Sequence, residues 1–179
     1  MNPITRGTPG TLGTPPTLTT DRLTLRAHRI EDFDAYADLW ASDEARFMGG
    51  PLDRSAAWGW FCSDVAAWTL QGHGAWAVDR SDDGAHVGQV SVIKLPDYAE
   101  RELGWLTYAA HRGQGYAPEA ARAARDYVFG TLGWDTVVSY IDPDNAASIR
   151  VAETLGATPD ADADRPDPTD LVYRHRRPQ

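Results

Sequence analysis

Residues 111–119 read HRGQGYAPE and join a predicted strand to a predicted helix. Gly113 and Gly115 let the backbone bend so that successive amides can point at one anion. The first amides of a helix have no internal partners, and the helix dipole adds partial positive charge there. With the Arg112 cation beside it, the stretch predicts a phosphate-binding loop. An ordinary tight turn is the alternative, because two glycines and an arginine are a weak signal by themselves.

The stretch differs from two common nucleotide-binding loops. It lacks the spacing of a Walker loop and the hydroxyl that would hold magnesium. It also comes late in the chain, after a predicted antiparallel meander, whereas a dinucleotide-binding loop opens its sheet. The phosphate carrier therefore has to be inferred from the rest of the chain.

The first half of the chain predicts helices followed by a meander. Leu23 and Leu25 alternate with polar residues, as in a strand, and Ser55 is a suitable cap for the second helix. An Asp-Gly turn at residues 83–84 favours a hairpin. The expected elements are a strand at 23–27, helices at 30–40 and about 56–70, and antiparallel strands at 75–79, 87–95 and 102–108.

The second half alternates strand and helix, which suggests a parallel crossover unit. The expected elements are a helix at 118–132, a strand at 136–141, a helix at 146–155 and a last strand at 171–175. An acidic, proline-containing loop at about 159–168 precedes that strand. The fold class is therefore α/β, of the α+β kind.

Composition limits the classes of function. The chain has 179 residues and a net charge of −9, which argues against nucleic acid or an anionic membrane as the main partner. Cys62 is the single cysteine, so no intrachain disulfide forms, and a reducing, cytoplasmic location fits. The five histidines lack metal-ligand spacing, so no metal is expected. Residues 1–18 predict a disordered leader, and residues 19–179 a single domain.

Two stretches taken together resemble a known family. Residues 112–117, RGQGYA, resemble the R/Q-x-x-G-x-G/A pyrophosphate loop of the GNAT superfamily of acetyl-CoA-dependent N-acetyltransferases, and residues 141–157, IDPDNAASIRVAETLGA, resemble its next motif, N-x-x-S…E-K-L-G-F. LTTDRLTLRAHRIEDFDAY, ELGW at 102–105 and GYAPEA at 115–120 resemble the branch that acetylates ribosomal-protein N-termini. The resemblance covers about residues 18–157.

The resemblance implies a mixed, mostly antiparallel central sheet with a splayed parallel strand pair and flanking helices. It also implies acetyl-CoA as cosubstrate, with its pyrophosphate on the loop amides and its pantetheine beside the strand at 103–107. Asn145 would contact the pantetheine, although it can also cap the following helix. The implied cofactor-binding residues are Leu106, Thr107, Arg112, Gly113, Gln114, Gly115, Tyr116, Ala117, Asn145 and Ser148.

Two residues are candidates for the chemistry. Glu102 could accept the amine proton directly or through water, and the alternative is a structural ion pair, for instance with Arg101. By resemblance Ser148 would donate to the leaving sulfur, and the alternative is a polar residue in a first helical turn. Two departures from the family pattern stand out. Ala152 occupies the position of the tyrosine acid that many members use, and Ala157 that of the usual phenylalanine.

By resemblance, the first two helices would wall a pocket for the amine, with plain core packing as the alternative. The expected activity is acetyl transfer to a primary amine, on a small molecule or a protein N-terminus, by direct attack in a ternary complex. A non-catalytic acyl-CoA-binding or sensor module, a pure interaction domain and another acyl donor stay open, and a homodimer is compatible with the resemblance. The candidate pocket residues are Phe33, Tyr36, Trp40, Met48, Trp60 and Phe61.

Overall fold

The computed structural model describes residues 13–178. Its eight strands form one sheet in the order β1-β2-β3-β4-β5-β6-β8-β7. The strands are β1 (Leu18–Thr19), β2 (Leu23–Arg26), β3 (Ala75–Arg80), β4 (His86–Ile93), β5 (Glu102–Thr107), β6 (Thr136–Ile141), β7 (Thr158–Pro159) and β8 (Leu171–Arg176). The helices are α1 (Phe33–Trp40), α2 (Arg54–Gln71), α3 (Tyr116–Gly130) and α4 (Ala146–Thr154), with short 3-10 turns η1 (Ile30–Asp32), η2 (Asp43–Met48) and η3 (Ala109–His111).

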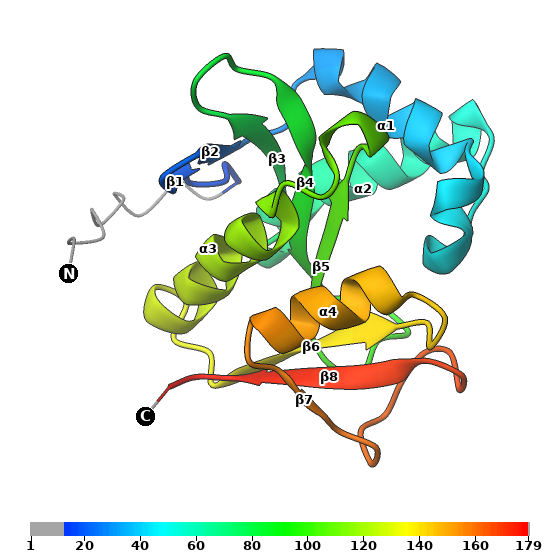
Figure 1. The fold of residues 1–179 in the computed structure, drawn as a ribbon, viewed down its shortest axis with the longest axis vertical. Helices are drawn as coiled ribbons and strands as arrows, with labels where there is room; N and C mark the ends of the chain where they lie inside the picture. The colour runs from blue at the N-terminus through cyan, green and yellow to red at the C-terminus, as the bar shows by residue number, and fades with distance from the viewer. Residues whose placement is uncertain (1–12, 179) are drawn as a thin grey trace.

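The sheet has two arms that part between β5 and β6 (Figure 1). The first arm runs from β1 to β5 and is antiparallel throughout, which confirms the predicted meander of β3, β4 and β5. The second arm holds β6, β8 and β7, which are also antiparallel. β5 and β6 are parallel, with α3 as the crossover between them. The predicted mixed, mostly antiparallel fold with a parallel pair and flanking helices is confirmed.

The main core lies between α3 and the first arm. Ala120, Ala121 and Ala124 form a small-residue face on α3 and pack on Val90 and Leu103 of the sheet. Small side chains let a helix approach a sheet closely, so the start of α3 is held firmly beside the end of β5. A second cluster joins α1 and α2 to the other side of the arm. Among the helices of residues 13–178, none has the length and apolar character needed to cross a membrane.

Several predicted boundaries were wrong by a few residues. Asp53, and not Ser55, caps α2, because its carboxylate accepts a 2.8 Å hydrogen bond from the Ala56 amide. α3 begins at Tyr116, so the expected helix start at Pro118 falls inside its first turn. The short strands β1 and β7 and the turn η2 were not predicted.

The predicted leader lies mostly on residues 1–12, outside the described residues. For residues 13–18, the prediction of disorder is wrong. The Trp76 indole donates a 2.8 Å hydrogen bond to the Pro16 carbonyl, and Leu18 pairs with Leu25 in the sheet. A buried indole N–H needs an acceptor, which fixes this stretch to β3.

Candidate active site

The parting of β5 from β6 leaves a gap at the centre of the sheet. Within these two fully described strands, the one paired position is Glu102 opposite Val138. One residue further on, the Ser139 hydroxyl donates a 2.6 Å hydrogen bond to the Leu103 carbonyl and lies 3.1 Å from His175 Nε2. A side chain therefore replaces the backbone pairing at the point where the strands separate. The splayed pair expected from the resemblance is present.

The separation leaves backbone groups of β5 without a strand partner. Tyr108 pairs through its amide with Val87, and the Val92 amide turns away from β5 to Gly74. Hydrogen bonding to a neighbouring antiparallel strand alternates from one residue to the next. The backbone N–H and C=O groups of Trp105 and Thr107 therefore point away from β4 and into the gap. Leu106 turns its own backbone groups toward β4, so it offers the gap a side chain only. The exposed edge of β5 can therefore pair with an extended, amide-containing ligand.

The predicted phosphate loop has the expected backbone. Gly113 and Gly115 have φ values of 73° and 78°, in the left-handed region that glycine adopts without strain. Gly115 is the N-cap of α3 and has no side chain to bond the helix amides. The amides of Tyr116 and Ala117 have no intrahelical acceptor, because they belong to the first turn. These amides are available to an anion.

Arg112 has a partner that the sequence did not suggest. Its guanidinium forms two hydrogen bonds with the Glu44 carboxylate, of 2.8 and 2.7 Å, and its Nε donates to the Thr107 carbonyl. Glu44 belongs to η2, so this ion pair ties η2 to the loop. An anion on the loop would compete with Glu44 for the Arg112 cation.

A second arginine braces the loop. Arg22 donates to the Gln114 carbonyl over 2.9 Å and to the Glu119 carboxylate over 2.7 Å. Its guanidinium also lies 5.0 Å from the centre of the Tyr116 ring. Burial acts to raise the pKa of Glu119, but the hydrogen bonds from Thr20 and Arg22 outweigh it and lower the pKa. Arg22 therefore fixes the loop conformation through three neighbours.

Two cavities meet at the gap. The loop cavity, of about 660 Å³, is lined by the predicted phosphate loop, the end of β5 and α4. Nine of the ten predicted cofactor-binding residues line it: Leu106, Thr107, Arg112, Gly113, Gly115, Tyr116, Ala117, Asn145 and Ser148. Gln114 does not, because its side chain accepts a hydrogen bond from the Tyr116 hydroxyl.

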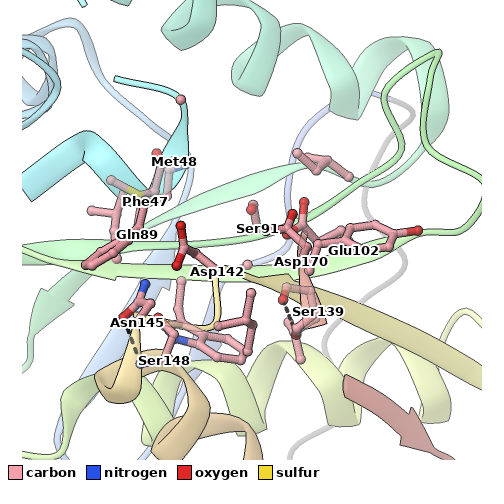
Figure 2. Close-up of a pocket in the computed structure, with 18 of the residues that line it drawn as sticks. Phe47, Met48, Gln89, Ser91, Glu102, Ser139, Asp142, Asn145, Ser148 and Asp170 are labelled. Carbon is pink, nitrogen blue, oxygen red and sulfur yellow. Dashed lines mark hydrogen bonds between the residues drawn. The ribbon is translucent and has the colours of Figure 1, made fainter. Parts of the chain in front are cut away.

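The acidic cavity, of about 530 Å³, lies between β4, β5, α1, α2 and the loop before β8. Its wall carries the carboxylates of Glu102, Asp142, Asp167 and Asp170. Asn145 and Ser148 line both cavities, and the Asn145 side chain accepts a 3.1 Å hydrogen bond from the Ser148 amide (Figure 2). The helix-capping role of Asn145 is therefore real, and its side-chain NH₂ still faces the cavities. Because Ser148 lines both cavities, it lies where the two cavities meet.

Glu102 lies on the wall of the acidic cavity, where its carboxylate is close to Asp170 (Figure 2). Burial is the main cause that raises its pKa to about 7, and the Asp170 charge adds to the rise. The backbone of Tyr140 and the hydroxyl of Tyr98 act in the opposite direction. A carboxylate with this pKa can take up a proton near neutral pH, as a general base requires. The alternative ion pair with Arg101 is absent from the described residues, because the Arg101 guanidinium stacks on Trp134.

The same pKa shift has a consequence for stability. The folded-state pKa of Glu102 lies above its ordinary value of 4.5, so the folded chain binds more protons than the unfolded chain between these values. The contribution of Glu102 to stability is therefore lost as pH rises from 4.5 toward about 7. We expect Glu102→Gln to raise the free energy of unfolding above neutral pH by ~1–3 kcal/mol and to change it little in acid. Urea unfolding at both pH values measures this, and equal effects at both would contradict it.

The predicted pocket residues divide into two groups. Tyr36, Trp40, Met48 and Trp60 line the acidic cavity. Phe33 and Phe61 do not. They pack against each other and against Trp58 with ring centres 4.9–6.0 Å apart, in the cluster between α1 and α2. For these two phenylalanines the core-packing alternative is correct.

Several cavity residues were not predicted. η2 supplies Glu44, Arg46 and Phe47, and its helical turn has no long apolar pattern that would reveal it. The segment before β8 supplies Asp167, which lies in the acidic loop predicted at about 159–168, and Asp170, which follows that loop. Asp64 and Gln89 lie inside a helix and a strand whose apolar residues predict core packing, and that pattern does not single out the polar residues among them. A lone acid in a tryptophan-rich helix was the one available signal for Asp64.

Comparison with known proteins identifies the family. The model of the Acetyltransferase (GNAT) domain matches residues 22–158. The crystal structure of an acetyltransferase from Agrobacterium tumefaciens is 48% identical with a TM-score of 0.89, covering 92% of this chain and 96% of that one. The uncharacterised protein YkkB of Bacillus subtilis is 31% identical over 78% of this chain and 83% of its own. The structure of RimL, a ribosomal L7/L12 alpha-N-protein acetyltransferase with coenzyme A, is 16% identical with a TM-score of 0.70 over 88% of this chain and 95% of that one, which shows a shared fold alone. The chain therefore belongs to the GNAT family of acetyltransferases and is an acyltransferase.

Proposed function

We propose that this chain transfers an acetyl group from acetyl-CoA to a primary amine by direct attack, with both substrates bound together. The observation that carries the proposal is the meeting of two cavities at Asn145 and Ser148, beside the unpaired edge of β5. One cavity has the features of a pyrophosphate site, and the other has carboxylates suited to a cationic amine. Neither the ribosomal branch nor a homodimer is needed for this proposal.

The loop cavity suits acetyl-CoA. The free amides of Tyr116 and Ala117 would hold the pyrophosphate, with Arg112 available once it leaves Glu44. The Trp105 carbonyl and the Thr107 amide would pair with the two amides of the pantetheine arm, as an added strand. The Asn145 NH₂ group would add a donor from α4. This placement brings the acyl group to the gap beside Ser139 and Leu103.

The chemistry requires few groups. The amine has to lose a proton to attack the thioester carbonyl, and Glu102 would accept that proton, directly or through water. Negative charge develops on the carbonyl oxygen, and the Trp105 amide is a fixed donor in the gap. The leaving thiolate needs a proton, and the Ser148 hydroxyl lies at the junction of the cavities. No covalent bond to the protein is needed.

Calorimetric titration with acetyl-CoA tests the cofactor assignment. We expect micromolar binding, about −8 kcal/mol, and weaker binding of dephospho-CoA only if the ribose phosphate is also held. A thiol-release assay with small amines and with N-terminal peptides then tests transfer and separates the two classes of acceptor. Binding without turnover by any amine would favour a sensor module. Absence of binding would refute the loop assignment.

Replacing Ser148 by alanine is expected to lower kcat about tenfold and to change the affinity for acetyl-CoA little, because the hydroxyl acts on the leaving sulfur. Ser148→Thr keeps a hydroxyl at the same position and should retain most of the activity. Steady-state kinetics of both variants with one amine measures this. Equal rates for Ser148→Ala and the parent protein would leave Ser148 as an ordinary residue of the first turn of α4.

A further inference from the structure

A buried polar cluster lies on the acidic cavity away from Glu102. Asp64 of α2 accepts two hydrogen bonds on the same carboxylate oxygen, one of 3.1 Å from the Tyr36 hydroxyl and one of 2.9 Å from Gln89 Nε2. The three side chains line the cavity and are at most 7% exposed. Burial is the main cause that raises the pKa of Asp64, and the hydrogen bond from Gln89, the charge of His28 and the hydrogen bond from Tyr36 act in the opposite direction. A carboxylate in such a place is costly unless a positive or donor group compensates it.

Two buried polar atoms, on α1 and β4 residues that line this cavity, have no partner within the described residues. Gln89 Oε1 accepts no hydrogen bond, and Trp40 Nε1 donates none, within the described residues. Both residues are more than nine-tenths buried, and both line the cavity. An unmet acceptor of this kind costs about 1–3 kcal/mol, so such atoms in a cavity indicate a missing ligand group.

The chemistry of the cluster selects a cation. Gln89 Oε1 and the Asp64 carboxylate are acceptors, so the missing group must be a donor. Trp40 and Trp60 are stacked with ring centres 5.7 Å apart, and both line the same cavity. Aromatic faces attract an ammonium or guanidinium group through their quadrupole. A donor that also carries positive charge therefore fits the two acceptors and the aromatic faces, whereas the Trp40 Nε1–H needs an acceptor such as a water molecule.

The cluster is separate from the proposed proton acceptor. On adjacent strands Gln89 lies opposite Leu106, while Glu102 lies opposite Ile93. The two rows are therefore four positions apart along β4, which corresponds to about 13 Å. Figure 2 also shows Gln89 and Glu102 at opposite sides of the cavity. A simple monoamine that reacts near Glu102 cannot also reach Gln89.

We propose that Asp64, Gln89 and the Trp40–Trp60 pair form a second cation subsite, and that the acceptor is a compound with two cationic groups. One amine is acetylated near Glu102, and the other cation is held by Gln89 Oε1 and the Asp64 carboxylate. The proposal rests on the proposed acetyl transfer and adds the class of acceptor to it. The net charge of −9 assists the approach of such a dication.

The test compares diamines with monoamines of equal chain length. The probes are diaminopentane and pentylamine, with the propane to octane homologues to find the best spacing. We expect kcat/KM for the best diamine to exceed that of its monoamine at least tenfold. In Asp64→Asn and in Gln89→Met this ratio should fall to about one, through the KM for the diamine. Asp38→Asn on the exposed face of α1 makes the same charge change away from the cavity and should keep the ratio.

A binding measurement keeps this proposal separate from the proposed activity. The best diamine is titrated into the CoA-loaded parent protein and into each variant that retains the parent's cooperative thermal unfolding. Binding to the parent that weakens at least tenfold in Asp64→Asn or Gln89→Met supports the subsite even if no amine is acetylated. Equal use of diamines and monoamines, or a preference that survives both substitutions, overturns it, and an ordered water then satisfies Gln89.

Discussion

Replacing Glu102 by glutamine is expected to lower kcat/KM for the amine about 100-fold above neutral pH, a typical size for the loss of a general base. The side chain keeps its shape and loses its ability to take a proton. The parent enzyme should gain activity as pH rises through about 7, because Glu102 acts in its deprotonated form and its pKa is raised to that value. The pH–rate profile of the variant should lack this rise in activity near pH 7. Binding of acetyl-CoA should not change, because Glu102 does not line the loop cavity.

The neighbouring Glu100 provides a matched control. Its carboxylate forms two 2.7 Å hydrogen bonds with Arg174, which are the main cause that lowers its pKa, and it does not line the acidic cavity. Glu100→Gln therefore removes a charge two residues away without removing the proposed base. We expect its pH profile to retain the limb near 7. A Glu102→Gln enzyme with the parent's pH–rate profile would exclude Glu102 as the base.

The parts of the site that follow local rules were predictable. Several features of the site depend only on a short run of suitable residues. They are the left-handed glycines of the loop, the start of α3 without a side-chain cap, and the polar cap before α4. The loop at 112–117 and the pair Asn145 and Ser148 could therefore be read from the chain, and the structure brings them together in one cavity. The meander was predictable for the same reason, since alternation and an Asp-Gly turn are local signals.

The parts that depend on tertiary packing were not predictable. The ion pair of Arg112 with Glu44 joins residues that are 68 positions apart, and nothing near either residue indicates it. Asp64 and Gln89 are 25 positions apart and meet only because α2 packs against β4. Aromatic residues could be counted but not assigned, so Phe33 was expected in the pocket together with Trp60, although only Trp60 lines it. Side-chain direction on a helix that is apolar on most sides is decided by its neighbours.

Replacing Gly115 by aspartate is expected to weaken acetyl-CoA binding about 100-fold, because it adds a negative charge where the first amides of α3 would meet the pyrophosphate. Gly115 has a φ of 78°, and a Cβ there would lie 3.4 Å from the Arg22 guanidinium. Backbone strain contributes as well, at roughly 1 kcal/mol for a side chain in this region.

Two variants separate charge from strain. Gly133→Asp places the same side chain at a φ of 72°, in open space after α3 and outside the loop cavity, so acetyl-CoA affinity should stay at the parent value. Gly115→Ala adds bulk without charge and should weaken binding only about tenfold. Calorimetry at low and high salt completes the test, since a charge effect shrinks as salt screens it. Unchanged affinity in Gly115→Asp would mean that the glycine loop is only a turn, and the proposed site for acetyl-CoA would be lost with it.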